Sequence, residues 1–403
     1  MKHIAACLAA ALVLAATLVP APAFADEDGD YLSQAVSDAW ARHLAAREAG
    51  DRQAAGDAAI EAHLAAERDG ADALTRAILA DTAGQYVYLR QDFPGARAKL
   101  SLAASLYEGL DDSHLNSRVR VLGLIADAYH SEDNFRQALN YVNQVLEAAG
   151  PAGADPVRDR AIADALVVRS RTQWRQSSIN DAGRTAREAL ELMEPAGYDQ
   201  FVLSGLMAFY AGVESALQRR HAESAWWFAA ADHQFRLRGS SPHLSTVSEA
   251  WARYARSRMT QGQRRELITR LYQAGFITDD EHDDAQEDGA EDDAAEEADG
   301  RASAQSAPYD PNNRPARPIS RASPSYPMAA AQASLEGVAL VSFTVGADGR
   351  VKDAEVVFSA PHTIFGEEAL RAVRRWRYEP RMVDGQPVDH EGVQTMLDFR
   401  LRG

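Results

Sequence analysis

The stretch "VALVSFTVGADGRVKDAEVVF" (residues 338–358) decides the fold of the C-terminal part of this chain. Its two halves, "VALVSFTV" and "VKDAEVVF", are rich in β-branched and aromatic residues and predict two strands. Gly346-Ala347-Asp348-Gly349 joins them, and its Asp-Gly pair is typical of a tight turn. The stretch therefore predicts an antiparallel hairpin.

A helix and a third strand are predicted after this hairpin. Apolar residues at helical spacing mark the helix, which ends before Pro380: Phe365, Ala369, Ala372, Val373 and Trp376. The final run "VQTMLDFRL" (residues 393–401) alternates between two faces, as a half-buried strand does. Pro327 suits the start of a short helix through Gln332 to Leu335. We expect a small α+β domain in which a helix crosses a three-stranded antiparallel sheet.

The heptapeptide "RRWRYEP" (residues 374–380) lies at the end of the predicted helix. We expect Trp376 to face the core, and Arg371, Arg374 and Arg375 to face water near a helix C-terminus, where the helix dipole favours cations. Two interpretations of these arginines stay open. They form a solvated basic face, or they contact an acidic or polar partner strand.

Residues 324–403 resemble the C-terminal domain of TonB proteins. The motifs that carry the resemblance, in chain order, are Ser325-Tyr326-Pro327, Glu336-Gly337-Val338, Asp348-Gly349-Arg350-Val351, Ala369-Leu370-x-Ala372-Val373-x-x-Trp376-Arg377-Tyr378-x-Pro380, Gly385-x-Pro387-Val388 and a terminal strand containing Phe399. The resemblance implies a periplasmic module that grips a short N-terminal segment of an outer-membrane transporter. It also implies that the module passes on force from an inner-membrane, proton-driven motor.

Such a grip fits the predicted sheet, because an outer strand leaves one row of backbone N–H and C=O groups unpaired. Carried over by position, the candidate partner-binding residues are Val393, Gln394, Thr395, Met396, Leu397, Asp398 and Phe399 on the strand, with Tyr326 and Pro327 beside it and Arg374 and Arg375 as further candidates. The alternative is that the same edge pairs with a second copy of itself and forms a homodimer.

Residues 26–278 predict helical hairpins with a period near 42 residues. The recurring turns are Asp92-Phe93-Pro94-Gly95-Ala96, Asn134-Phe135-Arg136-Gln137-Ala138, Ser178-Ile179-Asn180-Asp181-Ala182 and Arg220-His221-Ala222-Glu223-Ser224-Ala225. The pattern resembles tetratricopeptide repeats, although their usual period is about 34 residues. It implies an all-α superhelix whose concave face holds a protein partner, here unknown. Trp226 and Trp227 either wedge between repeats or belong to that face.

Residues 279–323 predict a disordered linker, first acidic and then spaced by prolines. Residues 279–299 hold thirteen Asp and Glu and no Lys or Arg, so they account for most of the formal net charge of -17. An acidic balance argues against nucleic acid as a partner.

Residues 1–25 predict a signal peptide: Lys2 is followed by an apolar stretch and by the small-x-small site Ala23-Phe24-Ala25. We expect a periplasmic protein exported through a cleavable signal. The alternative is an uncleaved anchor in the inner membrane with the chain on its periplasmic side. A cleavable signal and a repeat array in place of a long Pro-rich spacer favour an adaptor over an energy transducer coupled to motor proteins. A dimerising envelope scaffold is a third hypothesis.

An enzyme is the class that the sequence favours least. The three lysines, Lys2, Lys99 and Lys352, include none that follows a glycine, so a Walker loop is excluded. The sequence also contains neither a Gly-x-Ser-x-Gly elbow nor two histidines four positions apart on a predicted helix. We expect no catalytic residues, no metal and no cofactor.

Overall fold

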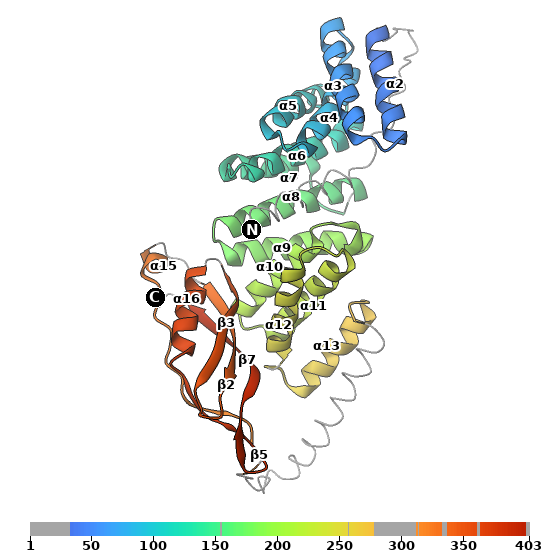
Figure 1. The fold of residues 1–403 in the computed structure, drawn as a ribbon. Helices are drawn as coiled ribbons and strands as arrows, with labels where there is room; N and C mark the ends of the chain where they lie inside the picture. Colours follow the sequence, from blue (N-terminus) through green and yellow to red (C-terminus); the bar gives the residue numbers. More distant parts are fainter. Residues whose placement is uncertain are drawn as a thin grey trace. The chain divides into compact units, whose positions relative to one another are not determined.

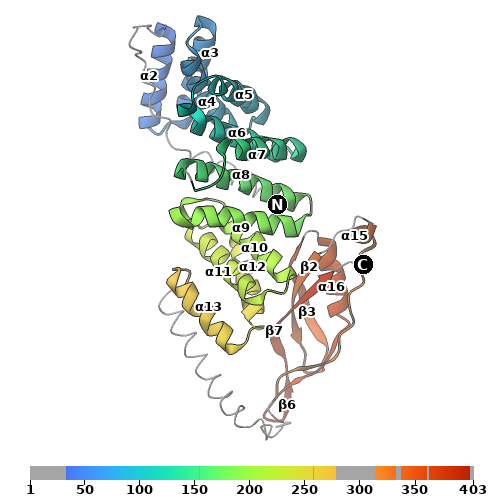
Figure 2. The same ribbon diagram turned by 180° about the vertical axis from the view of Figure 1, so that it is seen from behind.

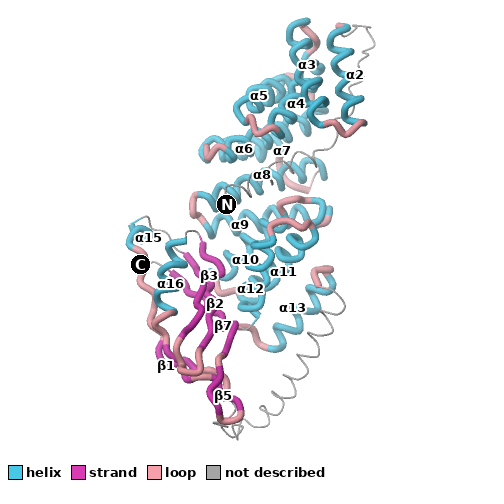
Figure 3. The backbone as a smooth tube through the Cα atoms, in the orientation of Figure 1, coloured by secondary structure: helices cyan, strands magenta, loops and turns pink. Residues whose placement is uncertain are grey.

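The computed structural model describes residues 33–153, 155–256, 258–277, 312, 314–332, 337–360 and 363–399. The predicted signal peptide, most of the linker, and Leu335 and Leu401 lie outside these residues. In the described part, helices dominate up to residue 277 and the strands all follow (Figure 1, Figure 3). Among the described helices, none combines the length and the apolar character that a membrane span needs.

The helical part runs from α2 to α13. Its α-helices are α2 (Gln34–Glu48), α3 (Arg52–Asp69), α4 (Ala73–Leu89), α5 (Phe93–Glu108), α6 (Leu115–Ser131), α7 (Phe135–Ala149), α8 (Pro156–Arg175), α9 (Ile179–Met193), α10 (Ser204–Leu217), α11 (His221–Leu237), α12 (Pro242–Arg256) and α13 (Gln261–Gln273), with short 3-10 turns at η1 (Asp112–His114), η2 (Glu194–Ala196) and η3 (Tyr198–Gln200). Successive helices pack on one another, for example α4 on α5, α6 on α7, and α11 on α12 (Figure 2). This arrangement agrees with the predicted helical repeats.

The four predicted turns each precede a helix, because α5, α7, α9 and α11 begin within them. The residue two positions before each of these helices has a positive φ of 58–64°: Gln91, Asp133, Ser177 and Arg219. The side chains of Asp92 and Asn134 then cap α5 and α7 by accepting hydrogen bonds from backbone N–H groups of the first turn. The period of 42 to 44 residues in the sequence is therefore the recurrence of one turn conformation.

The chain divides into two compact units, Met1–Gln173 with Arg184–Met207, and Trp174–Gly183 with Ala208–Gly403. The first unit buries charged groups between its helices. Asp127 on α6 is only 1% exposed, and it accepts hydrogen bonds from Tyr88 Oη on α4 and, at 2.5 Å, from Arg171 Nη1 on α8. Burial, and then the charge of Asp127, raise the pKa of Tyr88 well above its usual value. Tyr88 therefore stays protonated and acts as a donor.

His43 on α2 predicts a pH dependence of stability in this unit. The side chain is fully buried, its Nδ1 lies 2.9 Å from the carbonyl oxygen of Ala55, and burial lowers its pKa below 6.5. The pKa of this histidine is lower in the folded protein than in the unfolded chain, so protonation favours unfolding. The free energy of unfolding is therefore highest above pH 6.5 and falls as the pH drops, by up to about 1.4 kcal/mol per pH unit.

The test compares the free energy of unfolding at pH 7.5 and at pH 5.5. We expect the wild type to lose more stability than the variant His43→Asn, whose amide nitrogen can still donate to Ala55 but does not titrate. Equal losses in the two proteins would contradict this prediction.

The C-terminal part contains β1 (Arg317–Ser320), α15 (Met328–Gln332), β2 (Gly337–Val345), β3 (Val351–Ala360), α16 (Thr363–Val373), β4 (Arg377–Glu379), β5 (Arg381–Val383), β6 (Gln386–Val388) and β7 (His390–Phe399). β2 pairs antiparallel with both β3 and β7, so the sheet has the order β3-β2-β7. The predicted three-stranded antiparallel sheet is confirmed. Gly349 in the hairpin turn has φ +74°, and a Cβ there would lie 2.2 Å from the carbonyl oxygen of Tyr378, so only glycine fits.

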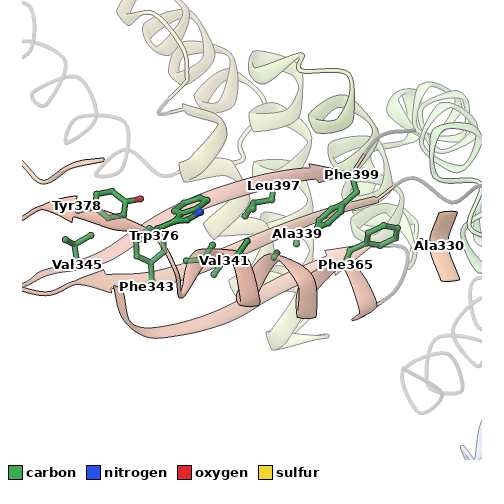
Figure 4. Packing of buried hydrophobic residues seen from close by; sticks show 13 residues of the cluster. Ala330, Ala339, Val341, Phe343, Val345, Phe365, Trp376, Tyr378, Leu397 and Phe399 are labelled. Carbon is green, nitrogen blue, oxygen red and sulfur yellow. The ribbon is translucent and has the colours of Figure 1, made fainter. Parts of the chain in front are cut away.

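α16 packs across β3 and β2 and encloses an apolar core (Figure 4). The buried core residues include Val341, Phe343, Phe365, Trp376, Leu397 and Phe399. Trp376 is 4% exposed, its ring meets that of Phe343 edge to face at 6.1 Å, and its Nε1 donates a 2.8 Å hydrogen bond to the carbonyl oxygen of Ala322. The prediction that Trp376 faces the core is confirmed.

The β5–β6 hairpin was not predicted, and two further features differ from the expectation. The helix ends at Val373 rather than near Trp376, because the chain then turns into β4, where Tyr378 N–H donates to the carbonyl oxygen of Gly349. In addition, β1 lies inside the segment predicted as linker, where it pairs antiparallel with β4. An ion pair between Arg314 and Glu379 at 2.5 Å supports that pairing. Both features depend on partners distant in the sequence, so local patterns did not indicate them.

Candidate functional site: the outer strand of the C-terminal sheet

The candidate site is the strand β7. In the described part of the chain, β7 pairs with β2 on one side and is an outer strand on the other. The pairing with β2 runs from Phe399 opposite Gly337 to His390 opposite Val345. An outer strand presents backbone N–H and C=O groups to whatever extended chain approaches it.

The side chains of β7 hold this strand firmly in place. Leu397 and Phe399 are buried in the core beneath α16, and Val393 packs against the same core. Gln394, Met396 and Asp398 alternate with them on the opposite face of the sheet. Thr395 is also buried, at 7% exposure. One face of the strand is therefore committed to the core, whereas the side chains on the other face are only partly buried.

Tyr326, a candidate contact beside the strand, lies where β7 ends. The ring of Tyr326 meets the rings of Phe365 and Phe399 edge to face at 6.3 and 6.1 Å. Pro327 is buried directly before α15. The structure thus brings the segment around Tyr326 together with the last residue of the strand.

Arg374 and Arg375 are exposed directly after α16. Among the described residues, no hydrogen bond or ion pair joins either side chain to β7, and α16 itself lies over β3 and β2. The structure therefore does not bring the two arginines to the strand, and a contact between them and a partner stays a prediction.

The other end of β7 is fixed by a residue that the sequence reasoning missed. Asp389 Oδ1 accepts a 2.7 Å hydrogen bond from Ala347 N–H in the hairpin turn, and both carboxylate oxygens lie 3.3 Å from Lys352 Nζ. The backbone hydrogen bond, and then Lys352, lower the pKa of Asp389. This clamp joins the turn between β2 and β3 to the start of β7. Nothing in the sequence pattern pairs positions 42 residues apart.

Within the described ranges, no group of three or more His, Cys, Asp or Glu residues is placed to hold a metal ion. What the C-terminal sheet offers is a fixed outer strand with aromatic rings at one end and a carboxylate clamp at the other.

The family model for the Gram-negative bacterial TonB protein C-terminal domain matches residues 322–401. Residues 322–401 form a TonB C-terminal domain. The match begins two residues before the boundary expected at residue 324 and leaves α2 to α13 outside it.

Protein TonB of Klebsiella pneumoniae is 39% identical over 87 residues, which are 22% of this chain and 33% of that protein. Protein TonB of Escherichia coli K12 is 37% identical over 87 residues, or 22% of this chain and 34% of that protein. The solution structure of the Pseudomonas aeruginosa TonB C-terminal domain is 33% identical and covers 23% of this chain and 92% of its own, with a TM-score of 0.21. This chain spans about one third of the length of the two curated relatives.

Proposed function

We propose that the TonB C-terminal domain binds an extended segment of an outer-membrane transporter, or of another envelope protein, as a fourth strand beside β7. The position of β7 at the edge of the sheet carries this proposal. Strand addition uses backbone hydrogen bonds for affinity and is therefore tolerant of the partner's sequence. The role is one of binding and involves no catalysed reaction.

The rest of the proposal follows from the sequence. We place the protein in the periplasm after export through residues 1–25, with a second protein bound by the helical repeats. The alternatives are an energy transducer anchored in the inner membrane and coupled to motor proteins, and an envelope scaffold in which the β7 edges of two copies pair. The mass of the protein isolated from cells tests the anchored transducer. A mature chain that starts at Asp26 has lost residues 1–25 and therefore excludes an anchor there.

Strand addition predicts a strictly alternating effect of peptide methylation. Binding is measured by titration calorimetry of the full protein with a peptide from the N-terminal segment of a transporter of the same organism. Two further peptides carry N-methyl groups on three backbone amides each, one on the odd and one on the even residues. Only every second amide of an added strand faces its neighbour. We expect one peptide to bind about 100-fold more weakly and the other to bind about as well as the parent.

Two results would contradict strand addition at β7. One is that none of the unmodified transporter peptides binds. The other is that both methylated peptides lose affinity equally, which indicates recognition by side chains. Sedimentation of the full protein without peptide tests the scaffold alternative, because pairing of β7 edges gives a dimer that the peptide dissociates.

A further inference from the structure

The face of the sheet that points away from α16 is covered. Along β2, Val338 and Leu340 alternate with the core residues Ala339 and Val341 and so point to the opposite face. Both are fully buried, at 0% exposure, although neither belongs to the core beneath α16. An isolated three-stranded sheet with one helix would leave these two side chains in water. Another part of the protein must therefore lie on them.

The covering elements are α12 and the part of α10 from Ala208 onward, which belong to the same compact unit as the sheet. The ring of Phe358 on β3 meets Phe209 on α10 edge to face at 5.2 Å and Trp251 on α12 at 6.3 Å. Phe209 and Trp251 are themselves buried, at 2% and 0% exposure. Phe358 pairs with Leu340 across the strands, so the aromatic contact lies directly beside the buried leucine.

A charged contact accompanies the apolar one. Arg219 Nη2 lies 3.0 Å from Asp398 Oδ2 on the covered face of β7. Arg219 is the left-handed residue of the turn between α10 and α11, with φ 58°, so its place relative to the helices is set by the repeating turn geometry. Its side chain is 70% exposed, so the ion pair itself adds little energy to this contact.

The covering helix α12 reaches across the sheet. α12 approaches both β3 and β7, which are separated by β2. A helix that reaches both outer strands crosses the face of the sheet instead of running along one edge. The helices contact the sheet through side chains that stand perpendicular to it. Strand addition uses different groups, the backbone N–H and C=O groups in the plane of the sheet.

We propose that the last helices of the array, α10 and α12, are the docking site for the TonB domain of this same chain. The helical repeats then hold the domain in one orientation in which β7 can still bind a partner. Without this contact, only the linker would connect the domain to the helices. Residues 278–313 join the two parts, and a connection of that length gives an effective concentration in the millimolar range, at which even a weak contact forms. The proposal does not depend on what β7 binds.

The test measures the distance between the array and the domain in the full-length protein. Spin labels are attached to cysteines at two exposed positions, Leu237 at the end of α11 and Ile319 on β1, with Cys7 replaced by serine. We expect a narrow distance distribution in this background. Phe358→Ser removes the aromatic contact and is expected to broaden the distribution. Its matched control is Val383→Ser, which removes an exposed apolar side chain outside the docked face and leaves the distribution narrow.

Charge reversal provides a second measurement that does not depend on the folding of the Phe358 variant. Arg219→Asp alone and Asp398→Arg alone are expected to broaden the distribution, and the double variant is expected to narrow it again. A broad distribution in the unmodified background, or a narrow one in every variant, would overturn the proposal. So would a signal between separately labelled copies after mixing, because it would place the contact between two chains.

Peptide binding separates this proposal from the proposed function. Phe358 lies on β3, away from the β7 edge. We expect Phe358→Ser to bind the transporter peptide within about threefold of the wild type. A large loss of affinity in this variant would overturn the claim that the docked face and the binding edge are independent. Failure of every peptide to bind the wild type would remove the strand-addition proposal, and the distance measurements would still decide the docking.

Discussion

Replacing Asp127 by alanine is expected to lower the free energy of unfolding of the first unit by about 3–5 kcal/mol. Asp127 is the acceptor for both Tyr88 and Arg171, and the side chain of Arg171 is only 6% exposed. Removal of the carboxylate takes one buried counter-ion away from the guanidinium. Hydrogen exchange of amides in α4, α6 and α8 measures the loss, because it reports on this unit separately from the rest of the chain.

Two further variants show whether the loss comes from the uncompensated charge. Glu61→Ala breaks an ion pair of the same unit, with Arg42, in which the two side chains are 56% and 58% exposed, so we expect the exchange of α4, α6 and α8 amides to stay close to that of the wild type. The double variant Asp127→Leu with Arg171→Met removes both buried charges and is expected to recover much of the stability. A double variant as unstable as Asp127→Ala would show that the pair itself, and not the unpaired charge, is what the fold requires.

Trp376→Ala is expected to destabilise the TonB domain by about 3–5 kcal/mol. The substitution leaves a cavity between Phe343 and Tyr378 in a small core and takes the donor away from the carbonyl oxygen of Ala322. Hydrogen exchange of β2 and β7 amides should increase accordingly. The site would then lose its fixed outer strand, so peptide affinity should fall together with protection.

Controls for this variant come from the neighbouring positions. Trp376→Phe keeps an aromatic ring but not the indole N–H, and a loss of about 1–2 kcal/mol is expected. Arg375→Ala changes an exposed side chain and should stay within about 0.5 kcal/mol of the wild type. If Trp376→Ala left the exchange of β2 amides unchanged, the tryptophan would not hold the core together.

Patterns within about twenty residues predicted most of the elements correctly. The Asp-Gly turn between β2 and β3 and the alternation along β7 are local signals, and both are present in the structure. The recurring turns before α5, α7, α9 and α11 are local as well, since they depend on a left-handed residue and a cap. The early end of α16 and the strands β1 and β4 were missed, because β1 and β4 exist only through pairing with each other. The β5–β6 hairpin was missed as well, although its Asp384-Gly385 turn is a local signal.

The sequence by itself determined the class of each part and the strand on which the candidate site lies. Periodicity and turn chemistry act between near neighbours, so they can be read without knowing the fold. Only the tertiary structure decided that the second face of the sheet is covered. Arg219 and Asp398 are 179 residues apart, and Phe209 and Phe358 are similarly distant. Contacts between residues so far apart produce no periodic pattern in the sequence. They depend on how complete helices and strands pack against one another, and not on the local interactions that form each helix or strand.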